Sequence, residues 1–82
     1  MKEKKETLAP GSVIAKQLRF YRMTKQELAG QMGITKNQVE KLIAGEARLT
    51  RNVAVKLEKA LNLPADFWMN LEEVYQQNKD EE

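Results

Sequence analysis

Two helix-start signals lie eleven positions apart in the segment "MTKQELAGQMGITKNQVEKLIAG", residues 23–45. Thr24 is followed three residues later by Glu27, and Thr35 is followed at the same spacing by Gln38. This is the spacing of a capping box, in which the threonine hydroxyl accepts from the third helical amide and the Glu or Gln side chain reaches back to the capping amide. The segment therefore predicts two short helices that meet at a sharp angle.

A lone glycine, Gly33, stands between these two predicted helices. Glycine tolerates the left-handed conformation that closes a helix, which a β-carbon would penalise. Ala29 is small enough for the second helix to cross close above it, and Ile34 and Val39 are expected to fill the angle between the helices. Together these features are the pattern of a helix-turn-helix.

The second helix of this pair carries polar side chains near its N-terminus: Lys36, Asn37, Glu40 and Lys41. In a helix-turn-helix, residues at these positions reach base edges in the DNA major groove. Asn can pair bidentately with adenine and Lys can donate to guanine acceptors, whereas Glu40 is expected to form a surface salt bridge. A helical hairpin with the same pattern and no role in DNA binding is the alternative.

The N-terminal part of the chain predicts an arm followed by a helix. Residues 1–9 are rich in Lys and Glu and are expected to be flexible. Pro10 and Gly11 then interrupt the chain, and Ser12 is the expected N-cap of a helix that runs to about Arg22.

The C-terminal part predicts two more helices. Thr50 begins one, which Pro64 ends, and "ADFWMNLEEVY" at residues 65–75 forms the other. The segment from Gln76 onward is expected to fray. No strand pattern occurs, so the chain is predicted to be an all-α, five-helix domain over residues 10–77, followed by an acidic tail at 78–82.

Composition limits the function classes. The 82 residues suffice for one small domain, and they include no Cys and no His. Disulfides and thiolate metal sites are thereby excluded, and the commonest general base is missing, so we expect no metal, no cofactor and no enzyme. No apolar run approaches the roughly 20 residues that span a bilayer. The N-terminus has no apolar signal core, so a cytoplasmic location is expected.

Charge is unevenly distributed along the chain. Residues 12–61 carry ten Lys and Arg against four Glu, a net charge of +6. Residues 62–82 carry one Lys against six acids, a net charge of −5. The basic part suggests a polyanion as partner and the acidic part a different one, although either could be only a solvated surface.

The motif "LAxxxGIT…V…LIAG" resembles the helix-turn-helix of the Xre, or lambda-repressor-like, family. The segments "PGSVIAKQL" at residues 10–18 and "GEARLTRNVAVKLEKALNLPADFWMNLEEVY" at 45–75 resemble, more narrowly, the HigA/VapI group of antitoxins. This resemblance implies a dimeric DNA-binding antitoxin that binds a palindromic operator, represses its own operon and neutralises a toxin, usually an mRNA-cleaving ribonuclease. A stand-alone prophage-type repressor, or a toxin-binding module without DNA binding, are the alternatives.

The resemblance also implies roles for individual residues. Those that would read bases are Lys36, Asn37 and Lys41. Those that would contact phosphates are Thr24, Lys25, Thr35, Arg48 and Arg51. Many relatives have Gln at the position of Lys25; lysine keeps the phosphate contact but lacks an amide that could also hold the first recognition residue.

The last predicted helix is rich in aromatic and acidic residues. Phe67, Leu71 and Val74 are expected in the core. Trp68 follows Phe67 by about 100° around the helix, so Trp68, together with Tyr75, is predicted to contact a second subunit.

The adjacent carboxylates Glu72 and Glu73 diverge on a helix and do not suggest a catalytic pair. They are candidates for contact with a basic toxin, because a ribonuclease that binds RNA has a basic surface. The acidic residues at the C-terminus could equally serve only to keep the protein in solution.

Overall fold

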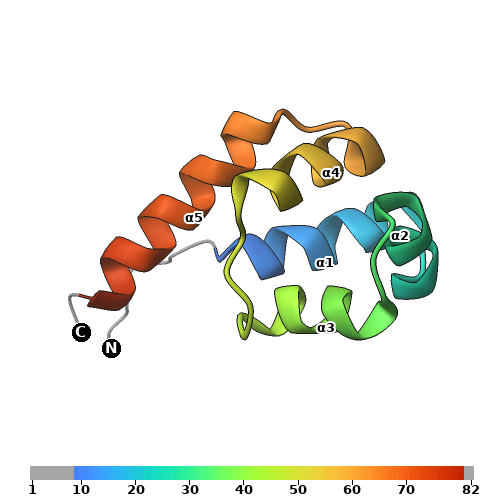
Figure 1. The fold of residues 1–82 in the computed structure, drawn as a ribbon, viewed down its shortest axis with the longest axis horizontal. Helices are drawn as coiled ribbons and strands as arrows, with labels where there is room; N and C mark the ends of the chain where they lie inside the picture. The colour runs from blue at the N-terminus through green and yellow to red at the C-terminus, as the bar shows by residue number, and fades with distance from the viewer. Residues whose placement is uncertain (1–8, 81–82) are drawn as a thin grey trace.

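The computed structural model describes residues 9–80 as five α-helices (Figure 1). They are α1 (Pro10–Tyr21), α2 (Lys25–Met32), α3 (Lys36–Ala44), α4 (Arg51–Leu61) and α5 (Ala65–Asp80). This part of the chain contains no strand, so the prediction of an all-α, five-helix domain is confirmed. Except for Ala9, the predicted arm at residues 1–9 lies outside the described residues, as do residues 81–82 of the predicted tail.

The helices α2 and α3 begin with the two predicted capping boxes. The Thr24 hydroxyl accepts from the Glu27 amide at 3.0 Å, and the Thr24 amide donates to the Glu27 carboxylate at 2.8 Å. The corresponding distances between Thr35 and Gln38 are 3.1 Å and 2.9 Å. These bonds satisfy amides that have no partner within the helix, which fixes where each helix starts.

The start of α1 differs from the sequence prediction. The helix begins at Pro10 with Ala9 as its N-cap, and Ser12 lies inside its first turn, where its amide donates to the Ala9 carbonyl at 3.0 Å. Proline is favoured at this first position because its φ is already helical and its missing N–H would have no partner there. The expectation that Ser12 caps this helix is therefore wrong.

The end of α5 also differs. Thr50 caps α4 as predicted, since its hydroxyl accepts from the Val53 amide at 3.3 Å. However, α5 continues to Asp80, so the expectation that the chain frays from Gln76 is wrong for residues 76–80.

Trp68 is the largest fully buried side chain of the core described for residues 9–77. Trp68 lies on the buried side of α5. Ala65, three positions earlier, and Glu72, four positions later, share this side and are also buried. Phe67 and Val74 lie on another side of the helix and are 36% and 50% exposed. The prediction that these two residues belong to the core is therefore wrong, as is the prediction that Trp68 contacts a second subunit.

The arrangement of the helices exposes α3 along one edge of the molecule. In Figure 1, α1 lies between α4 above and α3 below, and α2 closes one end. α5 packs against α4 and α1, and its C-terminal part projects at the end opposite α2 (Figure 1). Among residues 9–80, no helix is both long enough and apolar enough to span a bilayer.

Candidate nucleic-acid interface

The turn between α2 and α3 is closed by backbone hydrogen bonds around Gly33. This residue has φ 72° and ψ 31°, the left-handed conformation that favours glycine. Its amide donates to the Gly30 carbonyl at 3.3 Å, and the next amide, of Ile34, donates to the Ala29 carbonyl at 3.0 Å. The pair of bonds is a Schellman motif, which sets the direction in which the chain leaves α2.

Apolar side chains fix the angle between the two helices. Val39 is fully buried and Ala29 is 1% exposed, while Ile34 is half-buried and packs against the core. The sequence prediction for these three residues is confirmed. With caps at both starts and this contact between them, α2 and α3 form a rigid helix-turn-helix.

The opposite side of α3 presents the predicted base-reading residues. Lys36 and Asn37 are in its first turn and Lys41 lies one turn further on, and all three side chains are exposed. Within residues 9–77, none of the three has a hydrogen bond or ion pair to another side chain. They are therefore available to an external ligand without breaking an existing contact.

The start of α2 brings Thr24 and Lys25 to the surface. The Thr24 hydroxyl oxygen accepts from the Glu27 amide, while the hydroxyl proton has no acceptor in the described part of the chain. The Thr35 hydroxyl, in contrast, also donates to the Gln38 side chain at 3.3 Å. Thr24 is thus better placed than Thr35 to donate to a phosphate, and Lys25 adds a charge beside it.

The structure connects Arg48 and Arg51 to α5 rather than to the exposed side of α3. Arg51 donates to Asp66 at 3.1 Å, with both side chains largely exposed. Arg48 lies 3.7 Å through Nε from the Glu72 carboxylate. The Arg51–Asp66 pair is exposed, and exposed pairs contribute little to stability, so Arg51 can leave Asp66 for a phosphate at small cost. The Glu72 side chain is only 9% exposed, so the departure of Arg48 would leave a nearly buried carboxylate without its cation.

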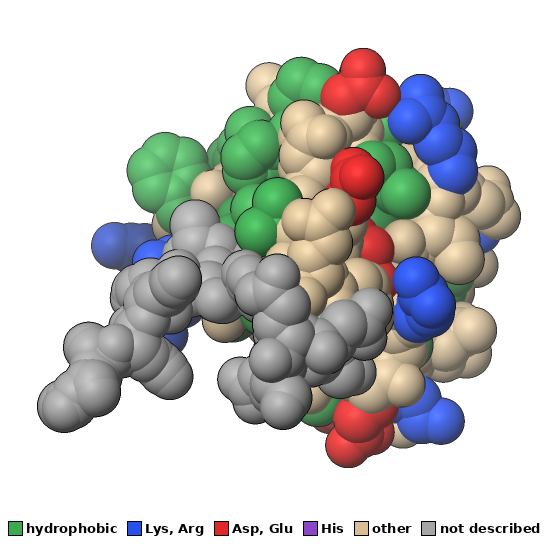
Figure 2. All heavy atoms as spheres, turned by 90° about the vertical axis from the view of Figure 1, so that its left-hand side faces the viewer, with side chains coloured by type: hydrophobic (Ala, Val, Ile, Leu, Met, Phe, Trp, Pro, Cys, Tyr) green, Lys and Arg blue, Asp and Glu red, His purple; other side chains and the backbone are tan. Residues whose placement is uncertain are grey.

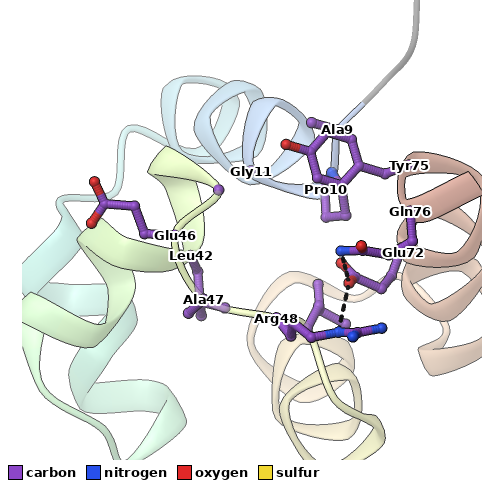
Figure 3. Close-up of a pocket in the computed structure, with 12 residues that line it drawn as sticks. Ala9, Pro10, Gly11, Leu42, Glu46, Ala47, Arg48, Glu72, Tyr75 and Gln76 are labelled. Atoms are coloured by element: carbon purple, nitrogen blue, oxygen red, sulfur yellow. Dashed lines mark hydrogen bonds and ion pairs between the residues drawn. The ribbon is translucent and has the colours of Figure 1, made fainter. Parts of the chain in front are cut away.

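A cavity of about 230 Å³ separates the start of α1 from α5 (Figure 3). Glu72 points into it from α5, with only 7% of the residue exposed, and its carboxylate accepts from the side-chain amide of Gln76 at 2.8 Å. Tyr75 lines the same cavity and its hydroxyl lies close to Gly45. Glu73, the other predicted carboxylate, is exposed.

Two cationic residues near α3 are not among the predicted DNA contacts. Arg19 and Arg22, at the C-terminal end of α1, line a groove between α1 and α3 together with Lys25 and Lys36. The signal was present, because Arg22 stands two residues before the Thr24 cap. The packing of α1 alongside α3, which forms the groove, cannot be predicted from the spacing of residues within either helix.

The matching family model, described as "Helix-turn-helix", covers residues 16–68. The chain belongs to this helix-turn-helix family. Its regulators and antitoxins are not enzymes, which confirms the prediction that this chain is not one.

Curated relatives support a narrower likeness. The chain is 42% identical over 50 residues to antitoxin HigA-1 of Vibrio cholerae, an alignment covering 61% of this chain and only 47% of that protein. It is 29% identical over 66 residues to the uncharacterized HTH-type transcriptional regulator YddM of Escherichia coli, covering 80% and 70% of the two chains.

Solved structures agree with this likeness. An addiction module antidote protein of the HigA family from Coxiella burnetii matches with a TM-score of 0.82 at 29% identity, over 88% of this chain and 79% of that one. Pseudomonas aeruginosa antitoxin HigA, solved with the higBA promoter, has a TM-score of 0.84 at 20% identity over 92% and 83%, and shows likeness of fold alone. The resemblance to HigA-type antitoxins of the Xre class is thereby confirmed.

Proposed function

We propose that this chain is a sequence-specific transcriptional repressor and the antitoxin of a HigBA-type toxin–antitoxin operon. One observation carries the DNA-binding part: α3 presents Lys36, Asn37 and Lys41 on an exposed side of a rigid helix-turn-helix, without other partners. Membership of a helix-turn-helix family supports it.

The mechanism is promoter occlusion by α3 bound in the major groove. Asn37 pairs with an adenine edge, and Lys36 and Lys41 donate to guanine acceptors or to nearby phosphates. Thr24 and Lys25 hold the backbone beside the groove, and neutralised phosphates supply most of the affinity. A palindromic operator is recognised by two copies whose α3 helices lie about 34 Å apart.

The second copy binds through α5. Phe67 and Val74 are exposed and Leu71 is half-buried, at positions that share one side of this helix. Figure 2 views the molecule from the end at which α5 projects. Apolar side chains gather at the upper left of this view, and acidic side chains lie beside them. This apolar side replaces Trp68 as the candidate interface, and Tyr75 stays a candidate from the neighbouring side.

A small ribonuclease toxin is the proposed protein partner. The likeness to antitoxin HigA-1 supports this assignment. Glu73 is exposed and is the more accessible contact for a basic toxin, whereas Glu72 is largely buried beside its cavity (Figure 3). Both partners, promoter DNA and toxin, place the protein in the cytoplasm.

The test is fluorescence anisotropy with a labelled duplex from upstream of the gene, run beside a scrambled duplex at two salt concentrations. Tight binding that depends on sequence at physiological salt is the expected result. Equal, salt-sensitive binding to both duplexes would reduce the basic surface to a generic polyanion site. Absence of binding to either would favour a module that binds only a toxin.

The toxin is tested separately. A purified neighbouring gene product should lose its ribonuclease activity when this chain is added. A variant with Lys36, Asn37 and Lys41 all replaced by Ala should still neutralise the toxin while losing the operator. If the protein binds DNA in a sequence-dependent way but no toxin gene lies beside its own, it would be a stand-alone repressor. The likeness to the regulator YddM also supports this alternative.

A further inference from the structure

We propose that the groove between α1 and α3 is a second contact surface for the DNA backbone, where Arg19 and Arg22 bind phosphates outside the base pairs that α3 reads. The inference rests on the proposed DNA-binding function and adds two residues to it. It concerns positioning on the duplex rather than the reading of bases.

The lining of the groove matches a sugar–phosphate backbone. Its rim carries four cationic side chains, those of Arg19, Arg22, Lys25 and Lys36, against the single carboxylate of Glu40. Its apolar lining comes from Ala15, Leu18, Met23 and Ile43. Phosphates would meet the cationic rim, and the apolar faces of deoxyribose would meet the apolar lining.

The two arginines have no competing partner in the part of the chain that the structure describes. Neither Arg19 nor Arg22 forms a side-chain hydrogen bond or ion pair there, and both side chains are exposed. Arg48 and Arg51, in contrast, are each paired with a carboxylate of α5. Of these four arginines, those of α1 can therefore bind an anion without losing an existing contact.

The backbone holds Arg22 in an unusual conformation. It is the C-cap of α1, with φ 55° and ψ 43°, where glycine is the ordinary residue. A β-carbon is disfavoured in this conformation, so the arginine is retained at a cost in backbone energy. Its amide donates to the Arg19 carbonyl at 3.2 Å, which fixes the two residues relative to one another.

Continuity with the base-reading surface favours DNA over other polyanions. Lys36 belongs both to the groove and to the first turn of α3, and Lys25 begins α2 beside it. A strand whose phosphates meet the start of α2 would pass directly along this rim. An acidic protein segment could bind the same charges, but its binding would not require them to lie next to α3.

The experiment compares two double variants of the full chain on the upstream duplex and on its scrambled form, over a range of salt concentrations. Arg19→Gln with Arg22→Gln should flatten the slope of log affinity against log salt by about two units. The ratio of affinities for the two duplexes should not change. The matched control, Lys16→Gln with Lys59→Gln, removes two exposed charges outside the groove and should leave the slope as in the wild type.

Ethylation interference provides a second readout, and its wild-type arm does not depend on the folding of any variant. In the wild type, ethylated phosphates flanking the half-site should weaken binding, and in the arginine variant they should not. A slope equal to that of the lysine control would overturn the inference while leaving the repressor intact. Loss of toxin binding with an unchanged slope would overturn it in favour of a contact between these arginines and an acidic segment of the toxin. A wild type that cannot distinguish the two duplexes would instead overturn the proposed function on which this inference depends.

Discussion

Gly11, in the first turn of α1, lies directly against the backbone carbonyl group of Ile43 in α3. A β-carbon at position 11 would overlap the Ile43 oxygen, which is backbone and cannot rotate away. The closeness of α1 to the recognition helix therefore depends on a residue without a side chain. Any enlargement at this position must move α3 relative to the rest of the domain.

Replacing Gly11 with Ala should destabilise the fold by about 1–3 kcal/mol, because overpacking forces backbone shifts. Urea unfolding followed by circular dichroism measures this free energy. The operator affinity should fall as well, since α3 is displaced.

Gly30 provides the matched control. It lies within α2, and a β-carbon there would meet nothing within 4 Å. Gly30→Ala should therefore stabilise the fold by about 0.4–1 kcal/mol through the unfolded chain. Similar unfolding free energies for the two variants would contradict the account of the α1–α3 contact.

The contrast between these glycines shows what the sequence could predict. The pair Pro10-Gly11 predicts only a local interruption of the chain, because neighbouring residues in the sequence carry information about local conformation alone. The reason for Gly11 is its contact with Ile43, 32 positions along the chain. Capping boxes at Thr24 and Thr35 were predictable because every atom involved lies within four residues.

Asn37 should carry sequence preference. Asn37→Ala is expected to cost about 1–3 kcal/mol on the cognate duplex and to relax the preference at one base pair. Anisotropy with a set of duplexes, each altered at one position, measures both effects. A loss of equal size on every duplex, scrambled ones included, would mean that Asn37 contacts the backbone rather than a base.

Lys25 should act through charge alone. Lys25→Ala is expected to reduce the salt slope by about one unit and to leave the preference between duplexes unchanged, because one phosphate contact is lost. The measurement is a salt titration of affinity on cognate and scrambled DNA. An unaltered slope would remove Lys25 from the phosphate contacts.

The site was less predictable than the helices for a physical reason. Exposed positions on α3 follow from its periodicity, so the exposure of Lys36, Asn37 and Lys41 is predictable from the sequence. The partners of Arg48 and Arg51 are carboxylates of α5, and the groove of Arg19 and Arg22 needs α1 beside α3. Such contacts join distant segments, and the spacing of residues within one helix carries no information about them.

The neighbouring residues Phe67 and Trp68 are expected to affect different properties, dimerisation for Phe67 and the stability of the fold for Trp68. Their rings meet edge to face with centroids 5.4 Å apart, yet Trp68 is fully buried and Phe67 is 36% exposed. Trp68→Ala should cost about 3–5 kcal/mol in unfolding free energy, as expected for an aromatic residue removed from a core.

Phe67→Ala should instead weaken the dimer. If Phe67 is an anchor of the proposed interface, its loss costs on the order of 2 kcal/mol of association, or about a thirtyfold higher dissociation constant. Sedimentation equilibrium measures this constant, and unfolding at a concentration where both proteins are monomeric measures the smaller effect on the fold. Lys59→Ala, an exposed change on α4, is the control that should alter neither. A dimer unaffected by Phe67→Ala would place the two-fold interface elsewhere, with Tyr75 and the neighbouring side of α5 as the next residues to replace.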